Sequence, residues 1–157
     1  MPRLVHFDDN HSVRFVTFSC YRKTPYLLDN HACELFVEAL NEFRTRLHIS
    51  ILGYVLMPDH VHLVLYPAPD TELGPLIGKL KGTVSHSCRS VPVPMWNKRC
   101  YDHNCRSISS VKEKIVYCHN NPVRRELVES ASDWKWSSAA WYEGKRDVPL
   151  AMDEYEL

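Results

Sequence analysis

The sequence predicts an α+β fold in which a single antiparallel sheet carries helices packed on it. Its 157 residues, 45% of them hydrophobic, suit one compact domain with a proper core. Short apolar runs with strand-like alternation are separated by longer runs with helical spacing. We therefore expect one domain over residues 1–157, with its core at about 13–138 and an acidic C-terminal tail at about 143–157.

The first strand and helix have clear patterns. Val13–Cys20 alternates β-branched and aromatic residues with polar ones, which predicts a strand. A loop follows over residues 21–29. His31–Leu47 carries apolar residues at helical spacing, with Asp29 or Asn30 as a possible N-cap.

Two further strands should lie next to each other. Ile49–Met57 and His60–Tyr66 are β-rich apolar runs separated by the turn dipeptide Pro58-Asp59. Side chains alternate between the two faces of a strand. In the second run one face holds Val61, Leu63 and Leu65, and the other holds His60, His62 and Val64.

The remaining elements complete a recognisable order. Residues 71–89 predict a second helix, whereas Met95–Arg106 fits a strand, a loop or both. A third helix should begin at Ser109 or Ser110 and end near Asn121, because the proline that follows disfavours helix before it. This order predicts a ferredoxin-like α+β sandwich with one additional terminal helix. The tryptophans of the irregular aromatic stretch at 133–141 are expected to pack, and base stacking is the alternative for Trp134, Trp136 and Trp141.

Charge is balanced overall but unevenly distributed. The chain has 19 basic and 19 acidic residues, so its formal charge is zero. The segment from Lys79 to Arg106, however, contains six basic residues and one acidic residue, so its net charge is plus five. Cations with aromatic residues among them suit single-stranded or hairpin DNA, although a solvated helix face followed by a loop explains the charges equally well. The candidate DNA-binding residues are Lys79, Lys81, Arg89, Trp96, Lys98, Arg99, Tyr101 and Arg106.

The six cysteines favour buried thiols over a disulfide framework. The N-terminus lacks the apolar core of a signal peptide, and no apolar run approaches the roughly 18 residues that span a bilayer. We therefore expect a reducing, cytoplasmic setting. A zinc site is the alternative, but no CxxC pair supports one. Its ligands would come from Cys100, His103, Cys105, Cys118 and His119.

His60 and His62 form the first candidate site. Alternate residues share one strand face, so both neutral imidazoles could bind one ion. Two ligands are too few for a complete site, and two partly exposed histidines on an edge strand remain an equal interpretation.

Tyr117 and Asn121 form the second candidate site. They are four residues apart near the end of the third helix, so they share a face. A tyrosine can accept a phosphoryl group, but the phenol has a free pKa of about 10 and needs a metal or cation beside it. For the tyrosine alone, simple packing of its ring is the more frequent role.

The motifs taken together resemble a known family. The run Leu56–Val64 (LMPDHVHLV), Met95–Asn97 with Tyr101-Asp102, Tyr117–Arg124 (YCHNNPVR) and Trp136–Ser138 occur in the family's order and spacing. They are similar to the REP-associated tyrosine transposases, which belong to the HUH single-tyrosine transposases of small bacterial insertion sequences. The resemblance covers about residues 13–138.

The resemblance implies roles for particular residues. His60 and His62 match the metal-binding pair, Tyr117 matches the nucleophile, and Asn121 falls where a further metal ligand is supplied. It also implies a ferredoxin-like fold of the HUH endonuclease type and a divalent metal, magnesium or manganese (Mg or Mn). The implied reaction is nicking and strand transfer of single-stranded hairpin DNA through a 5′-phosphotyrosine. The chain would then act at the nucleoid, as a monomer in preference to a homodimer.

Departures from the family pattern are few. Asn97 stands where many relatives have glutamine, Tyr101 stands where another aromatic or histidine is common, and the neutral charge is unusual for a transposase. A hairpin-binding module that no longer cuts is the main alternative function. A histidine-triad nucleotide hydrolase is disfavoured, because Val64 stands where that motif needs histidine.

Overall fold

The computed structural model describes residues 2–8 and 11–157. Its main sheet contains β2 (Val13–Cys20), β3 (Ser50–Leu56), β4 (His60–Tyr66) and β5 (Trp96–Cys105). The helices are α1 (Asn30–Leu47), α2 (Leu73–Ser87), α3 (Ile108–Arg124) and the short α4 (Ala139–Tyr142). Two short strands, β1 (Arg3–Leu4) and β6 (Tyr155–Glu156), pair in parallel near the chain ends.

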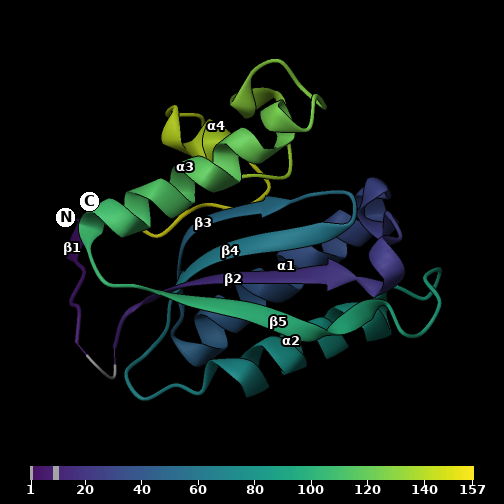
Figure 1. The fold of residues 1–157 in the computed structure, drawn as a ribbon, viewed down its shortest axis with the longest axis horizontal. Helices are drawn as coiled ribbons and strands as arrows, with labels where there is room; N and C mark the ends of the chain where they lie inside the picture. The colour runs from purple at the N-terminus through teal and green to yellow at the C-terminus, as the bar shows by residue number, and fades with distance from the viewer. Residues whose placement is uncertain (1, 9–10) are drawn as a thin grey trace.

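The main sheet has the order β3-β4-β2-β5, and every neighbouring pair is antiparallel. Both long connections between strands are helical, so the fold is the predicted ferredoxin-like sandwich with a further helix. Helices α1 and α2 lie on one face of the sheet, and α3 crosses the other (Figure 1).

The alternation of β4 separates two apolar layers. Val61, Leu63 and Leu65 enter the larger core beneath α1 and α2, whereas Val64 enters the smaller core beneath α3. His60 and His62 therefore lie on the α3 side, as the alternation predicts. The sheet thus presents both histidines toward a helix.

Helix α3 differs from its predicted bounds at both ends. The prediction of a cap at Ser109 or Ser110 was wrong, because the Ser107 side chain caps the helix by accepting from the Ser110 N–H at 3.1 Å. The predicted end near Asn121 was also wrong, because the helix continues through Pro122 to Arg124. A proline in the last turn loses one backbone donor, and later residues still close the turn: the Arg125 N–H donates to the Asn121 carbonyl at 3.0 Å.

The ambiguous segment Met95–Arg106 is mostly a strand. Its ten residues Trp96–Cys105 form the edge strand β5, which pairs with β2 and places Tyr101 opposite Thr17. The pairing shifts register between Phe18 and Cys20.

The segment after α3 covers the opposite edge of the sheet. The Leu56 N–H donates to the Trp136 carbonyl at 2.8 Å, and the Asp153 N–H donates to the Ile51 carbonyl at 2.9 Å. Leu150 and Met152 are buried in the larger core, so part of the expected acidic tail is packed. The tryptophans of this segment pack as predicted: Trp136 is buried in that core, with Trp134 and Trp141 against it.

The structure agrees with the expectation of buried, unpaired thiols and, in its described residues, with that of no membrane-spanning helix. All six cysteines are unpaired, and only Cys100 is not fully buried. No helix within residues 2–8 and 11–157 is long and apolar enough to cross a membrane.

Candidate active site

Both histidines of β4 are buried and held through the same ring nitrogen. His60 Nδ1 lies 2.6 Å from the Asp59 carboxylate, and His62 Nδ1 lies 2.7 Å from the Thr17 hydroxyl. The ring centroids of the two histidines are 4.8 Å apart. In each ring Nε2 is thus the nitrogen left for a ligand, and His62 Nε2 is buried with no hydrogen-bond partner among the described residues.

Burial keeps these imidazoles neutral. It lowers the pKa of His62 to about 3, and the neighbouring His60 and Lys23 act in the same direction. Burial also lowers the pKa of His60, although the hydrogen bond to Asp59 opposes the shift. Neutral rings at pH 7 keep the lone pair that a metal ligand needs.

Helix α3 places Tyr117 and Asn121 against the histidines. The Tyr117 ring lies edge-on to His62, with 5.2 Å between centroids, and its side chain remains 38% exposed. Asn121, one turn further along, is 4% exposed. The phenol is therefore accessible from solvent, whereas Asn121 is a buried part of the cavity wall.

One cavity of about 430 Å³ joins these groups. It brings together the four residues predicted as nucleophile and metal ligands, which come from β4 and α3. Its lining comprises Thr17, Lys23, His60, His62, Tyr117, Asn121, Arg124 and Arg125.

The residues predicted to bind DNA are not gathered at this cavity. Tyr101 is 59% exposed and occupies the same sheet row as Thr17 and His62, on the α3 side. Five others are exposed but lie on or after α2 and β5: Lys79, Arg89, Lys98, Arg99 and Arg106.

Lys81 and Trp96 face inward. The Lys81 ammonium donates to the Asn97 carbonyl at 2.6 Å, and the Trp96 indole N–H donates to the Lys81 carbonyl at 3.1 Å. Both side chains are buried, at 9% and 7% exposure. These two residues tie α2 to β5 and offer little surface to a nucleic acid.

Five cavity or support residues were missed from the sequence: Thr17, Lys23, Asp59, Arg124 and Arg125. Arg124 follows Tyr117 by seven residues, two helical turns on the same face, and that spacing could have identified it. Asp59 precedes His60 directly and was interpreted only as a turn residue. Thr17 and Lys23 lie more than 30 residues away in the chain, and nothing local to them indicates the site.

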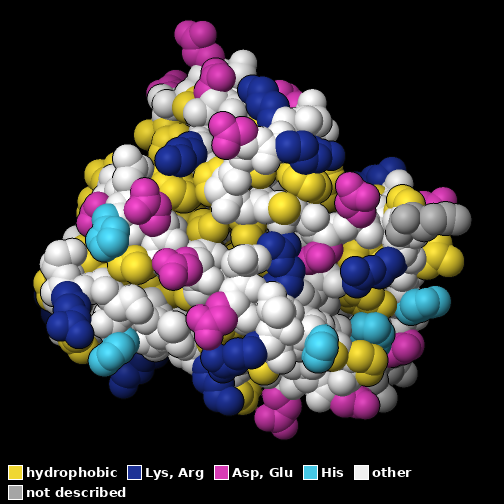
Figure 2. Space-filling view, turned by 180° about the vertical axis from the view of Figure 1, so that it is seen from behind, with side chains coloured by type: hydrophobic (Ala, Val, Ile, Leu, Met, Phe, Trp, Pro, Cys, Tyr) yellow, Lys and Arg dark blue, Asp and Glu magenta, His cyan; other side chains and the backbone are white. Residues whose placement is uncertain are grey.

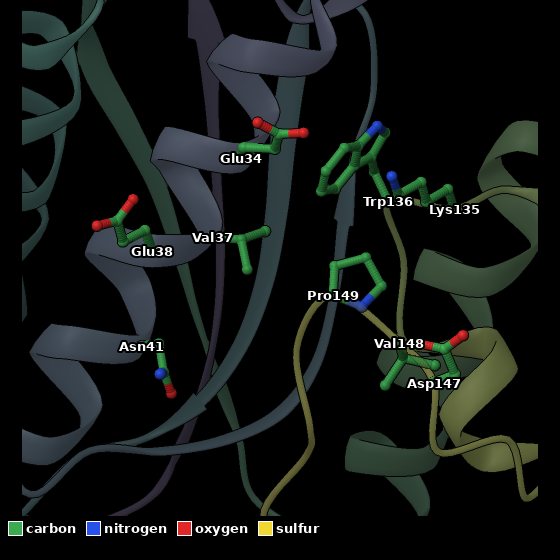
Figure 3. A pocket seen from close by; sticks show the side chains of 9 residues that line it. All are labelled: Glu34, Val37, Glu38, Asn41, Lys135, Trp136, Asp147, Val148 and Pro149. Atoms are coloured by element: carbon green, nitrogen blue, oxygen red, sulfur yellow. The ribbon is translucent and has the colours of Figure 1, made fainter.

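A larger cavity lies elsewhere, and its charge does not suit DNA. It measures about 630 Å³ and sets Glu34 and Glu38 of α1 across from Trp136 and Asp147 (Figure 3). Only Lys135 offsets these three carboxylates in its lining. The outer surface on the α1 side mixes positive and negative side chains (Figure 2), so neither feature suits a phosphate backbone.

The donor set fits magnesium or manganese. Two imidazole nitrogens and the Asn121 carbonyl oxygen are available, and the cavity leaves room for water and substrate oxygens. The orphaned His62 Nε2 is the structural sign that a ligand belongs there. No cluster of three or more His, Cys, Asp or Glu able to hold a metal occurs in the described part of the chain, so the alternative of a cysteine-histidine zinc site has no support.

The chain belongs to the IS200-like transposase family, whose pattern it matches over residues 8–104. Tyr117 and Asn121 lie beyond the matched residues.

Individual relatives agree with this assignment. A curated Haemophilus influenzae protein, provisionally described as a REP-associated tyrosine transposase, is 24% identical over 132 residues, which cover 71% of this chain and 75% of the relative. The solved structure of a REP-associated tyrosine transposase bound to a REP hairpin superimposes with a TM-score of 0.76 at 19% identity, covering 97% of this chain and 92% of that one. A transposase structure from Deinococcus radiodurans R1 gives a TM-score of 0.54 at 18% identity, covering 70% and 90%. At these identities the two structures show a shared fold.

Proposed function

We propose that this chain nicks and rejoins single-stranded hairpin DNA, with Tyr117 as the nucleophile and a divalent metal as cofactor. The observation that carries the proposal is the meeting of Tyr117 with two neutral histidines in one cavity, where His62 Nε2 has no partner among the described residues. Membership of a transposase family supports a DNA substrate. The hairpin bound by a protein of the same fold supports the form of that DNA.

The metal ligands would be His60, His62 and Asn121. Held by these residues, a magnesium or manganese ion would supply positive charge that stabilises the charge developing on the scissile phosphate. Asp59 and Thr17 hold the two rings so that Nε2 of each is presented. The lowered pKa values keep both rings ready to bind the ion at neutral pH.

Tyr117 would carry the covalent step. Its phenolic oxygen attacks phosphorus, the phenolic proton passes to solvent, and a bond from phosphorus to the tyrosine oxygen forms. The bond between phosphorus and the 3′-oxygen breaks, and that oxygen takes up a proton as the free 3′-hydroxyl. The product is a 5′-phosphotyrosine, with the number of phosphate ester bonds unchanged.

Because that ester bond is conserved, the step is reversible without ATP. A second 3′-hydroxyl can attack the phosphotyrosine and release Tyr117. Nicking and strand transfer are then one reaction in two directions, which is the chemistry a transposase requires.

The exposed residues along β5 and after α2 are proposed to hold the rest of the hairpin. Tyr101 offers a ring for stacking beside the cavity, and the neighbouring cations can contact backbone phosphates. Acting on genomic DNA would place the protein at the nucleoid.

A covalent-adduct assay tests the proposal. Labelled single-stranded hairpins from the flanks of the gene are incubated with manganese or with EDTA and separated on a denaturing gel. We expect a metal-dependent adduct that maps to Tyr117 and is absent from Tyr117→Phe. Tyr26→Phe is the matched control, because Tyr26 does not line the cavity and its ring packs against the larger core, so the adduct should remain.

The other outcomes are equally informative. An adduct that persists in Tyr117→Phe would make the nucleophile assignment wrong. Binding without an adduct across several flanking hairpins would indicate the binding module that no longer cuts.

A further inference from the structure

Three cations converge on the cavity around Tyr117, and none of the described carboxylates lines it. Lys23 comes from the turn after β2, and Arg124 and Arg125 come from the end of α3. We propose that Lys23, Arg124 and Arg125 form a clamp for consecutive backbone phosphates of the strand that is cut. The inference rests on the proposed function and names the part of the substrate that these residues bind.

Arg124 is positioned by the nucleophile itself. Its guanidinium carbon lies 4.5 Å from the centroid of the Tyr117 ring. This cation–π contact leaves the N–H donors available, and no described residue accepts a hydrogen bond from the Arg124 side chain. Its planar fork suits a phosphate next to the attacking oxygen.

The extension of α3 past Pro122 brings both arginines to the cavity. Had the helix ended near Asn121, Arg124 would not lie two turns from Tyr117 on the same face. The backbone N–H of Arg125 donates to the carbonyl of Asn121, so the predicted metal ligand also fixes this residue. Both arginine side chains are exposed to solvent and open to a substrate.

The turn that carries Lys23 to the cavity has an unfavourable backbone conformation. Arg22 and Lys23 have φ angles of 55° and 58°, in the left-handed region that non-glycine residues avoid. A residue in this region persists only where its surroundings fix it. Two bonds to the neighbouring segment do so: the Tyr21 N–H donates to the Met95 carbonyl at 2.8 Å, and the Arg22 N–H donates to Asn97 Oδ1 at 3.3 Å.

The positive charges of Lys23, Arg124 and Arg125 are not balanced by nearby carboxylates among the described residues. No described carboxylate lies within ion-pair distance of the three cations. The carboxylate nearest the histidines, Asp59, is engaged by the His60 ring. In a chain with zero net charge, a cavity with three cations is a local site for a polyanion.

Salt dependence of binding measures these contacts directly. In single strands each neutralised phosphate contributes about 0.7 to the slope of log K against log salt. The triple variant Lys23→Gln, Arg124→Gln, Arg125→Gln should therefore lower the slope by about 2, and each single variant by about 0.7. Binding is measured with a labelled single-stranded oligonucleotide in EDTA, in the Tyr117→Phe background, so that no cleavage occurs.

The control removes the same charge from other surfaces. Arg46→Gln, Lys112→Gln and Lys145→Gln together change three exposed cations that do not line the cavity. The control variant should show the same slope of log K against log salt as the Tyr117→Phe protein. Equal slopes for the clamp variant and the control would overturn the proposal, and the single variants repeat the test if the triple variant unfolds at a lower temperature.

The adduct assay on the otherwise unchanged protein separates this inference from the proposed function. If that protein forms no adduct but the triple variant binds DNA with a lower salt slope, the proposed covalent chemistry is wrong and the phosphate clamp is supported. If it forms the adduct and the clamp variant keeps its slope, the chemistry stands and the clamp is wrong.

Discussion

The Thr17 hydroxyl lies 2.7 Å from Nδ1 of His62, on the opposite side of the ring from the Nε2 atom that is proposed to bind the metal. The tautomer that donates its Nδ1 proton to the Thr17 hydroxyl leaves the Nε2 lone pair directed to the ligand position. Removing such a supporting bond lowers metal affinity about 10- to 100-fold in comparable sites. If His62 binds the metal as proposed, Thr17 is expected to affect metal affinity through His62, as a positioning residue.

Thr17→Val tests this role, because it replaces the hydroxyl with a methyl group of similar size. We expect manganese affinity, measured by calorimetric titration, to fall about 10-fold or more. Thr45→Val removes a hydroxyl from the exposed face of α1 and should leave the affinity unchanged. Equal affinities in the two variants would show that Thr17 has no part in orienting His62.

The site residues differ in how far sequence could predict them. His60 and His62 follow from strand alternation, and Tyr117 with Asn121 follows from helical spacing, since both periods are local. The burial of Lys81 and Trp96 could not be predicted, because it depends on α2 meeting β5, and a cation among charged neighbours usually faces solvent. The roles of His60, His62, Tyr117 and Asn121 in catalysis stay predictions until the adduct and metal are measured.

At the scale of elements, the distance between α3 and the sheet fixes the distance between Tyr117, the proposed nucleophile, and the two histidines of β4. Gly53 of β3 permits the close approach, because a Cβ built on it would lie 3.2 Å from Ile115 Cγ1 of α3. Ile115 stands two residues before Tyr117. Any displacement of the helix at Ile115 is therefore passed to the nucleophile.

Gly53→Ala should destabilise the protein and slow adduct formation. Forcing a methyl group into this contact is expected to cost about 1–3 kcal/mol, seen as a lower midpoint of thermal unfolding. The control is Gly78→Ala in α2, where an added Cβ has nothing within 4 Å and should stabilise the helix by about 0.5–1 kcal/mol. An unchanged adduct rate in Gly53→Ala would mean that α3 tolerates displacement without moving Tyr117.

The elements themselves were largely predictable, and their ends were not. The strands Val13–Cys20 and His60–Tyr66 agree with the pattern at both ends, because each stops at a turn or loop residue. Helix α3 overran its predicted end because packing of its buried face outweighs the local preference of the residue before Pro122. The longer helix places the Arg124 guanidinium over the Tyr117 ring.

At the scale of the whole molecule, Tyr117 lies beside the histidines of its own chain. This arrangement supports action as a monomer, since no exchange of α3 between copies is needed to assemble the cavity. The oligomeric state remains a prediction.

Mixing two variants that are each expected to be inactive tests whether one chain acts alone. Tyr117→Phe keeps the histidines, and His60→Ala with His62→Ala keeps the tyrosine. A chain that acts alone should form no adduct in the mixture at any ratio, measured on the denaturing gel. Recovery of the adduct, on the chain that carries Tyr117, would instead show that two copies share one site.

The cover over β3 has a consequence for self-association. An uncovered edge strand presents free backbone donors and acceptors that can template another chain. Here the segment around Trp136 and Asp153 occupies the β3 edge through its own backbone bonds. The opposite edge, β5, is open but charged, with exposed Lys98, Arg99 and Asp102. Removing residues 136–157 would therefore leave the buried β3 edge uncovered. The expected result is aggregation through extension of the sheet, while the residues of the cavity around Tyr117 remain in the chain.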